Sequence, residues 1–132
     1  MEEFKSGNTN TFYHTQGFRK LFVFQKAKEL VLLTYKITAR FPSRETYTLV
    51  SQMRRAAISI VANVVEGYSK SSKKEYARFL DISIGSVSEL EIYYELSLEL
   101  RYINKLELDR VNGLILETKK LLYTYQKSLR VK

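Results

Sequence analysis

Five polar residues recur at helical spacing inside the most apolar stretch of the sequence: Gln52, Arg55, Ser59, Asn63 and Glu66. Steps of three and four residues place them in one line along a helix. A buried amide or hydroxyl without a partner costs roughly 2–7 kcal/mol. The stripe must therefore either be paired by a second helix, as a buried polar network that fixes the register, or face a bound ligand.

The residue types that enzymes use for bond-breaking chemistry are scarce. The sequence has no cysteine, and its one histidine, His14, lies in the Gly-, Asn- and Thr-rich beginning of the chain. Ser59 and Ser86 therefore lack a base that would activate them, and Glu89 and Glu91 fall on different faces of a helix. Neither a Glu-x-x-His pair nor a Gly-rich phosphate loop occurs. We predict a protein without enzymatic activity, metal or cofactor.

Charge gives the stronger functional signal, because the net charge of +8 is unevenly placed. Residues 19–78 carry 13 Lys and Arg against 4 Asp and Glu, residues 79–109 carry 2 against 7, and residues 110–132 carry 6 against 1. This segregation predicts a basic and an acidic surface. The basic surface would neutralise phosphates and release their counterions. The predicted nucleic-acid contacts are Arg54, Lys70, Lys73, Lys74, Arg78, Lys119, Lys120, Lys127 and Arg130.

The helical pattern places no aromatic side chain clearly on this basic surface. We therefore expect recognition of the phosphate backbone and of shape, with little readout of base sequence and without base stacking.

Long helical patterns organise the chain. Residues 1–17 are predicted to form a mobile N-terminal arm. Pro42 ends the first predicted helix and Ser43 caps the second, while capping boxes at residues 72–75 and 104–107 open the third and fourth. The helices are predicted over about 18–41, 44–68, 73–102 and 105–129, within one domain of residues 18–132.

Short loops between long helices predict antiparallel neighbours, so the expected fold class is an all-α, up-down-up-down four-helix bundle. In the hairpin of the second and third helices, Arg55 is expected opposite Gly85 and Ser86, with Glu89 one turn further. Gly85 would let the two helices approach closely. The residues of the third helix expected to pair the polar stripe are Ser83, Ser86 and Glu89.

The apolar residues exceed what one bundle needs. Residues 56–65 are apolar almost all round the helix, which a single partner helix cannot cover. The third helix also carries apolar residues outside its main stripe, namely Ile84, Ile92, Tyr94 and Leu98. Such surplus apolar surface predicts self-association into a homo-oligomer.

The stretch FPSRETYTLVSQMRRAAISIVANVVEGYSKSSKKEYARFLDISIGSVSELE, residues 41–91, resembles the four-helix-bundle proteins encoded within intervening sequences of bacterial 23S rRNA genes. The resemblance covers about residues 18–128. It departs from the family at Val64-Val65, where Ile-Ala is usual, and at Phe24, where Trp is common. The shared signature is Phe41-Pro42, Glu45, Gln52, Arg55-Ala56, Ser59-Ile60, Asn63, Glu66-Gly67, Lys70-Ser71, Phe79-Leu80, Gly85-Ser86 and Glu89-Leu90-Glu91.

The resemblance implies bundles that assemble into five-fold rings, with association to rRNA or the ribosome. A related branch, the accessory variability proteins of diversity-generating retroelements, implies a basic pentameric barrel that binds nucleic acid and docks on a reverse transcriptase. We therefore expect a cytoplasmic, ring-like homopentamer that binds structured RNA rather than DNA, and no membrane association. The alternative is a scaffold that holds a reverse transcriptase or a ribosomal protein through one of two surfaces. One is the basic rim of the ring, and the other consists of acidic residues of the third helix, namely Asp81, Glu91, Glu95 and Glu99.

Overall fold

The structure is a computed structural model, and it describes residues 17–130. All regular elements in this range are helical, which confirms the predicted all-α class. The predicted arm lies outside the described residues except for Gly17, and His14 lies outside them as well. The elements are the 3-10 turns η2 (Gly17–Lys20) and η3 (Ser43–Glu45) and the helices α2 (Phe22–Thr38), α3 (Leu49–Tyr68), α4 (Lys73–Glu99) and α5 (Lys105–Arg130).

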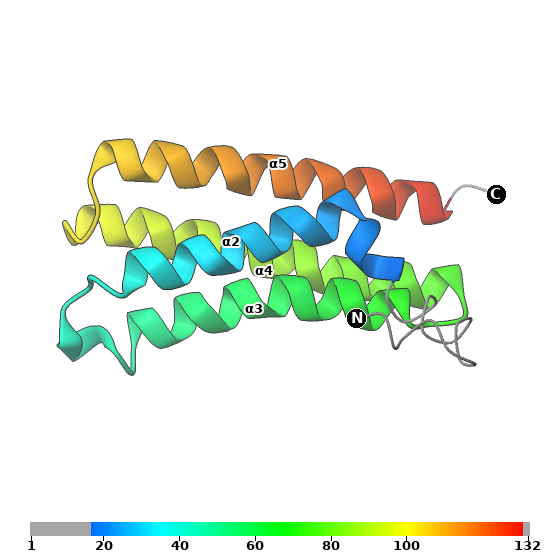
Figure 1. The fold of residues 1–132 in the computed structure, drawn as a ribbon, viewed down its shortest axis with the longest axis horizontal. Coiled ribbons are helices and arrows are strands. Elements are labelled where there is room, and N and C mark those ends of the chain that lie inside the picture. The colour runs from blue at the N-terminus through cyan, green and yellow to red at the C-terminus, as the bar shows by residue number, and fades with distance from the viewer. Residues whose placement is uncertain (1–16, 131–132) are drawn as a thin grey trace, which may run out of the picture.

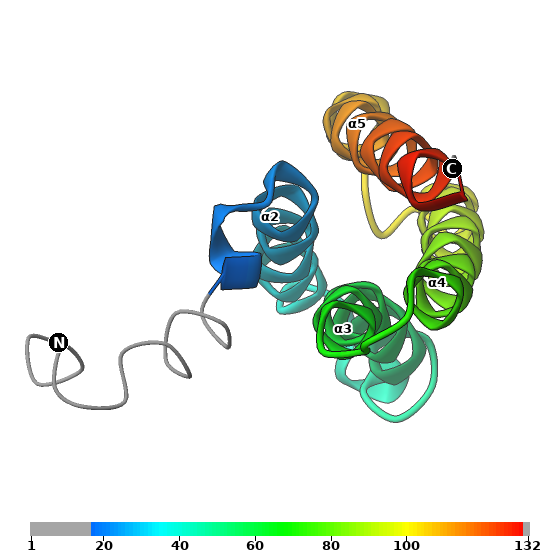
Figure 2. The same ribbon diagram turned by 90° about the vertical axis from the view of Figure 1, so that its right-hand side faces the viewer.

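The four helices lie side by side in the cyclic order α2, α3, α4, α5 (Figures 1 and 2). The α2–α3 and α4–α5 connections lie at one end of the bundle, and the α3–α4 connection lies at the other (Figure 1). The hydrogen bonds between α3 and α4 agree with this arrangement, because positions 55, 59 and 60 of α3 pair with positions 89, 86 and 83 of α4. Partner numbers therefore fall along one helix as they rise along the other.

The segment before α3 differs from the prediction. Ser43 does not cap a helix at residue 44, because residues 43–45 form the separate turn η3 and α3 begins at Leu49. Glu45 explains this turn: its carboxylate accepts hydrogen bonds from the hydroxyls of Thr48, at 2.6 Å, and Tyr102, at 2.7 Å. These bonds lower the pKa of Glu45 and attach η3 to the α4–α5 connection.

The two predicted capping boxes have different outcomes. Asn104 and Glu107 form the complete box, since each side chain accepts from the other residue's backbone N–H, at 2.8 and 3.0 Å. Ser72 forms only half of one: its hydroxyl accepts from the N–H of Glu75 at 3.1 Å. The Glu75 carboxylate turns away to Arg78, 3.2 Å from its guanidinium.

A continuous core runs along the bundle axis. Leu30, Met53 and Leu80 are fully buried in it, and each such side chain contributes about 1.5–3 kcal/mol of burial free energy. Tyr94 is also fully buried, and its hydroxyl shares a 2.7 Å hydrogen bond with that of Thr34 on α2. The description of Tyr94 as surplus apolar surface is therefore wrong.

The other three residues of α4 that were predicted as surplus apolar surface differ in their exposure. Ile84 belongs to the core and Leu98 is partly buried against it, so the chain itself covers much of their apolar surface. Only Ile92, which is 52% exposed, remains on the surface as predicted.

Candidate nucleic-acid interface

Basic residues concentrate at the end of the bundle that holds η2, the α3–α4 connection and the end of α5 (right-hand side of Figure 1). We call this end the basic pole and define it as residues 17–20, 63–82 and 120–130. It carries nine Lys and Arg against three Asp and Glu, whereas residues 36–54 and 91–110 at the opposite end carry seven against six. The excess of positive charge is therefore concentrated at one end of the bundle.

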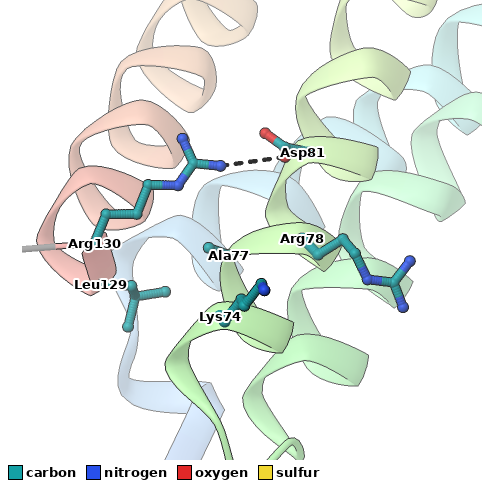
Figure 3. A pocket seen from close by; sticks show the side chains of 6 residues that line it. All are labelled: Lys74, Ala77, Arg78, Asp81, Leu129 and Arg130. Atoms are coloured by element: carbon teal, nitrogen blue, oxygen red, sulfur yellow. Dashed lines mark hydrogen bonds and ion pairs between the residues drawn. The ribbon is translucent and has the colours of Figure 1, made fainter.

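An open depression of about 460 Å³ lies on the basic pole between the first turns of α4 and the last turn of α5 (Figure 3). Lys74 and Arg78 border it from α4 and Arg130 from α5, with Asp81 as its one carboxylate. Arg130 points toward Asp81, 3.3 Å away, while Arg78 points away from this pair (Figure 3). A phosphate entering here would meet Lys74 and Arg130, with Asp81 as a competing anion.

Ion pairs divide the predicted phosphate contacts into two groups. Four are paired with carboxylates of the chain at 3.0–3.3 Å, and these are Lys70, Arg78, Lys119 and Arg130. Within residues 17–130, no ion pair engages the exposed side chains of Lys73, Lys74, Lys120 and Lys127. The second group can bind phosphate without first breaking an internal pair.

Arg54 lies apart from the other predicted contacts. It is half-buried between α2 and α3, where its Nε donates to the Thr38 hydroxyl at 2.9 Å. Its guanidinium carbon lies 4.4 Å from the centre of the Tyr35 ring. Through these contacts Arg54 holds α2 against α3. The prediction that Arg54 lies near the α3–α4 connection is therefore wrong.

Helix α4 pairs only part of the polar stripe of α3: Arg55 and Ser59 have partners on α4, whereas Gln52 and Asn63 form their hydrogen bonds within α3. Arg55 forms an ion pair with Glu89, and its Nε donates to the Gln52 side chain at 3.1 Å. The expected burial is wrong, however, because the Arg55 and Glu89 side chains are 50% and 37% exposed. The pair joins the two helices and is open to solvent.

The lower part of the stripe is held by hydroxyl groups. Ser86 donates to the Ser59 hydroxyl at 2.8 Å, and Ser83 donates to the Ile60 carbonyl at 2.9 Å. Asn63 donates back to the Ser59 carbonyl at 2.8 Å. Glu66, the last member, pairs with Lys70 on its own helix end and not with α4.

The close approach of α3 and α4 occurs at Gly67 and not at the predicted Gly85. A Cβ on Gly67 would lie 2.7 Å from the Tyr76 ring and 3.0 Å from the Cβ of Phe79. A Cβ on Gly85 would meet nothing within 4 Å. Gly85 is exposed on the outer face of α4, so the packing of a single chain does not require a glycine at this position.

Aromatic side chains that the sequence analysis did not place there lie buried or half-buried within the basic pole. Phe18, Tyr68, Tyr76 and Tyr125 form a row of edge-to-face contacts with ring centres 5.3–6.1 Å apart. Burial raises the pKa of Tyr76, with Tyr125 beside it adding to the shift. The row joins η2, α3, α4 and α5, and the sequence places its members in four separate segments. Only the register between helices reveals it.

A helical bundle with a cationic end is the class that this fold and surface define. The chain belongs to the 23S rRNA-intervening sequence protein family, whose profile matches residues 19–124. This confirms the resemblance found in the sequence. A search of curated proteins gives no match.

A solved structure shows the same fold. It is the crystal structure of a protein with unknown function from the S23 ribosomal protein family of Bacteroides thetaiotaomicron, similar to this chain with a TM-score of 0.72 and 24% identity. The match covers 80% of this chain and 95% of that one. Among residues 17–130, no helix has the length and apolar composition required to cross a membrane.

Proposed function

We propose that the protein is a non-enzymatic, oligomeric RNA-binding protein whose basic pole holds the phosphate backbone of structured RNA. The observation that carries this proposal is that one end of the bundle holds nine Lys and Arg residues against three Asp and Glu residues. Lysines without internal partners make the pole a better phosphate site than its net charge alone implies. Each phosphate they neutralise releases counterions, so affinity falls as salt rises.

We further infer that the chain is an antiparallel up-down-up-down bundle that assembles head to tail into a ring, with the five-fold number taken from the family resemblance. The opposite order of the helix contacts supports the antiparallel arrangement. A closed ring needs two different surfaces on each copy, whereas a two-fold dimer needs one.

Two separate apolar surfaces support the ring. One is a depression of about 190 Å³ between α2 and α3, lined among others by Leu32, Ile58 and Val61. The other is the outer face of α4, where Ile92 and Leu96 are 52% and 41% exposed. A ring would repeat the basic pole, so that weak phosphate contacts add through multivalency.

The alternative function is a scaffold that holds a reverse transcriptase or a ribosomal protein. The observation in its favour is that Glu95 and Glu99 are exposed on α4 beside Leu96, without an ion pair within residues 17–130. A basic protein partner would fit this mixed acidic and apolar surface. Salt would screen the charge contacts of such a complex but not its apolar contacts, so the complex should be less sensitive to salt than RNA binding is.

Native mass spectrometry with a structured RNA over a salt series tests the proposal. The double variant Lys74→Gln, Lys127→Gln should lose most RNA binding at moderate salt. The matched control is Lys36→Gln, Arg110→Gln, which removes two exposed charges at the opposite end.

An equal loss of RNA binding in the two double variants would show that only the net charge of the protein matters, and would refute a site at the basic pole. A ring that takes up no RNA at any salt concentration would favour the scaffold.

A further inference from the structure

A second depression lies at the basic pole, between the start of α2 and the end of α5. Its volume is about 220 Å³. In Figure 2, which looks onto this end, α2 and α5 are neighbouring helices of the bundle. The lining is apolar apart from three hydroxyl groups, and includes Leu21, Phe22, Leu121, Thr124, Tyr125 and Ser128.

The aromatic walls of this depression differ in exposure. Phe22 is 72% exposed, so its ring contributes little to the core. Tyr125 is half-buried, and Tyr76 braces it edge to face with the ring centres 5.3 Å apart. One wall is therefore a fixed aromatic ring and the other a solvent-facing one, an arrangement suited to a flat aromatic ligand.

Unpaired lysines frame the same depression. Lys20 precedes Leu21, and Lys120 and Lys127 stand four residues before and three residues after Thr124 on α5, which makes them its helical neighbours. All three are exposed, and no ion pair engages them within the described range. Lys120 and Lys127 are seven residues apart, about 10 Å along the helix axis.

We propose that this depression binds an unpaired nucleobase of the RNA whose phosphates lie on the flanking lysines. Its volume is below the roughly 300–1,000 Å³ of sites for drug-sized ligands, which suits a single ring system. The apolar walls and cationic rim together match a base and its backbone, since ring stacking and phosphate neutralisation are the two contacts that single-stranded nucleic acid offers.

This inference rests on the proposed function and makes it narrower. It replaces purely backbone recognition with a preference for RNA that presents a bulged or looped-out base. A fully paired helix keeps its bases stacked and cannot fill the depression.

An RNA hairpin with one bulged 2-aminopurine, compared with the same hairpin carrying an abasic residue at the bulge, isolates the base from the phosphates. We expect the intact hairpin to bind about tenfold tighter, in the range found for base–aromatic stacking. We also expect its fluorescence to change on binding. Phe22→Ala should abolish the difference between the hairpins. The matched control Tyr47→Ala removes an aromatic ring that is 91% exposed in the α2–α3 connection, and should retain the difference.

The outcomes separate this inference from the function on which it rests. Equal, salt-sensitive binding of both hairpins by the unmodified protein would overturn the base site and leave backbone binding intact. Binding of neither hairpin would overturn both. If Phe22→Ala changes the oligomeric mass and weakens both hairpins equally, the depression is a contact between subunits and the base site is refuted.

Discussion

If the depression between α4 and α5 holds a phosphate of the RNA, as proposed, Asp81→Asn should strengthen RNA binding. The Asp81 carboxylate is the one anion in that depression, and it accepts hydrogen bonds from Gln126 and Arg130. A phosphate that binds Arg130 must compete with this carboxylate and approach its charge. An asparagine keeps an oxygen for the Gln126 amide while removing both obstacles.

The magnitude follows from the exposure of the pair. The Asp81 and Arg130 side chains are 56% and 58% exposed, so their ion pair contributes only about 0–1 kcal/mol to folding stability. A carboxylate about 5 Å from a phosphate repels it by about 0.8 kcal/mol at the dielectric constant of water. This corresponds to about a fourfold lower Kd for Asp81→Asn at low salt.

Fluorescence anisotropy with a labelled structured RNA between 50 and 200 mM salt, an interval that changes phosphate contacts by orders of magnitude, measures the effect. The freed Arg130 should make the slope of log affinity against log salt steeper by about 0.7–0.9. Asp109→Asn is the matched control, since Asp109 also pairs with a cation, Lys105, but at the opposite end. An unchanged or weaker affinity in Asp81→Asn, or an equal gain in the control, would refute the assignment of phosphate to this depression.

Three further substitutions test the packing by chemical denaturation. Gly67→Ala should destabilise the protein by about 1–3 kcal/mol because its Cβ overlaps the Tyr76 ring, and a neutral result would contradict the close approach. Gly85→Ala, where a Cβ has open space, should instead stabilise the isolated chain by about 0.5–1 kcal/mol through helix propensity. Arg101→Gly should stabilise by about 0.5–1 kcal/mol, since Arg101 has φ 66° in the turn that ends α4; a lower denaturation midpoint would show that its side chain has a role of its own.

The sequence predicted features that belong to one helix at a time. The spacing of the polar stripe, the stop before Pro42 and the Asn104–Glu107 capping box depend on local geometry, and the structure shows all three. Features that depend on the register between helices were predicted less well. Arg55 meets Glu89, a turn beyond the expected position, because the hairpin turns later in the chain than assumed.

The functional surface shows the same limit. Composition and charge order identified most of the cations that the pole contains. Which lysines are unpaired depends on carboxylates from other turns and helices, as with Lys119, which Glu91 of α4 holds at 3.0 Å. The aromatic row was missed for the same reason, because Tyr68, Tyr76 and Tyr125 become neighbours only when three helices pack.

The half-exposed Arg55–Glu89 pair connects the folding of one chain with its assembly. In an isolated chain, Arg55→Ala should cost no more than about 1 kcal/mol, since exposed pairs contribute little. Gly85 and Ile92 lie on the same outer side of α4 as Glu89, so a neighbouring copy seated there would cover the pair. Breaking a covered pair leaves a buried charge and costs about 3–5 kcal/mol. The cost of Arg55→Ala should therefore rise with protein concentration if the outer face of α4 is a subunit interface. A cost that stays small while sedimentation shows a ring would place the interface on other surfaces.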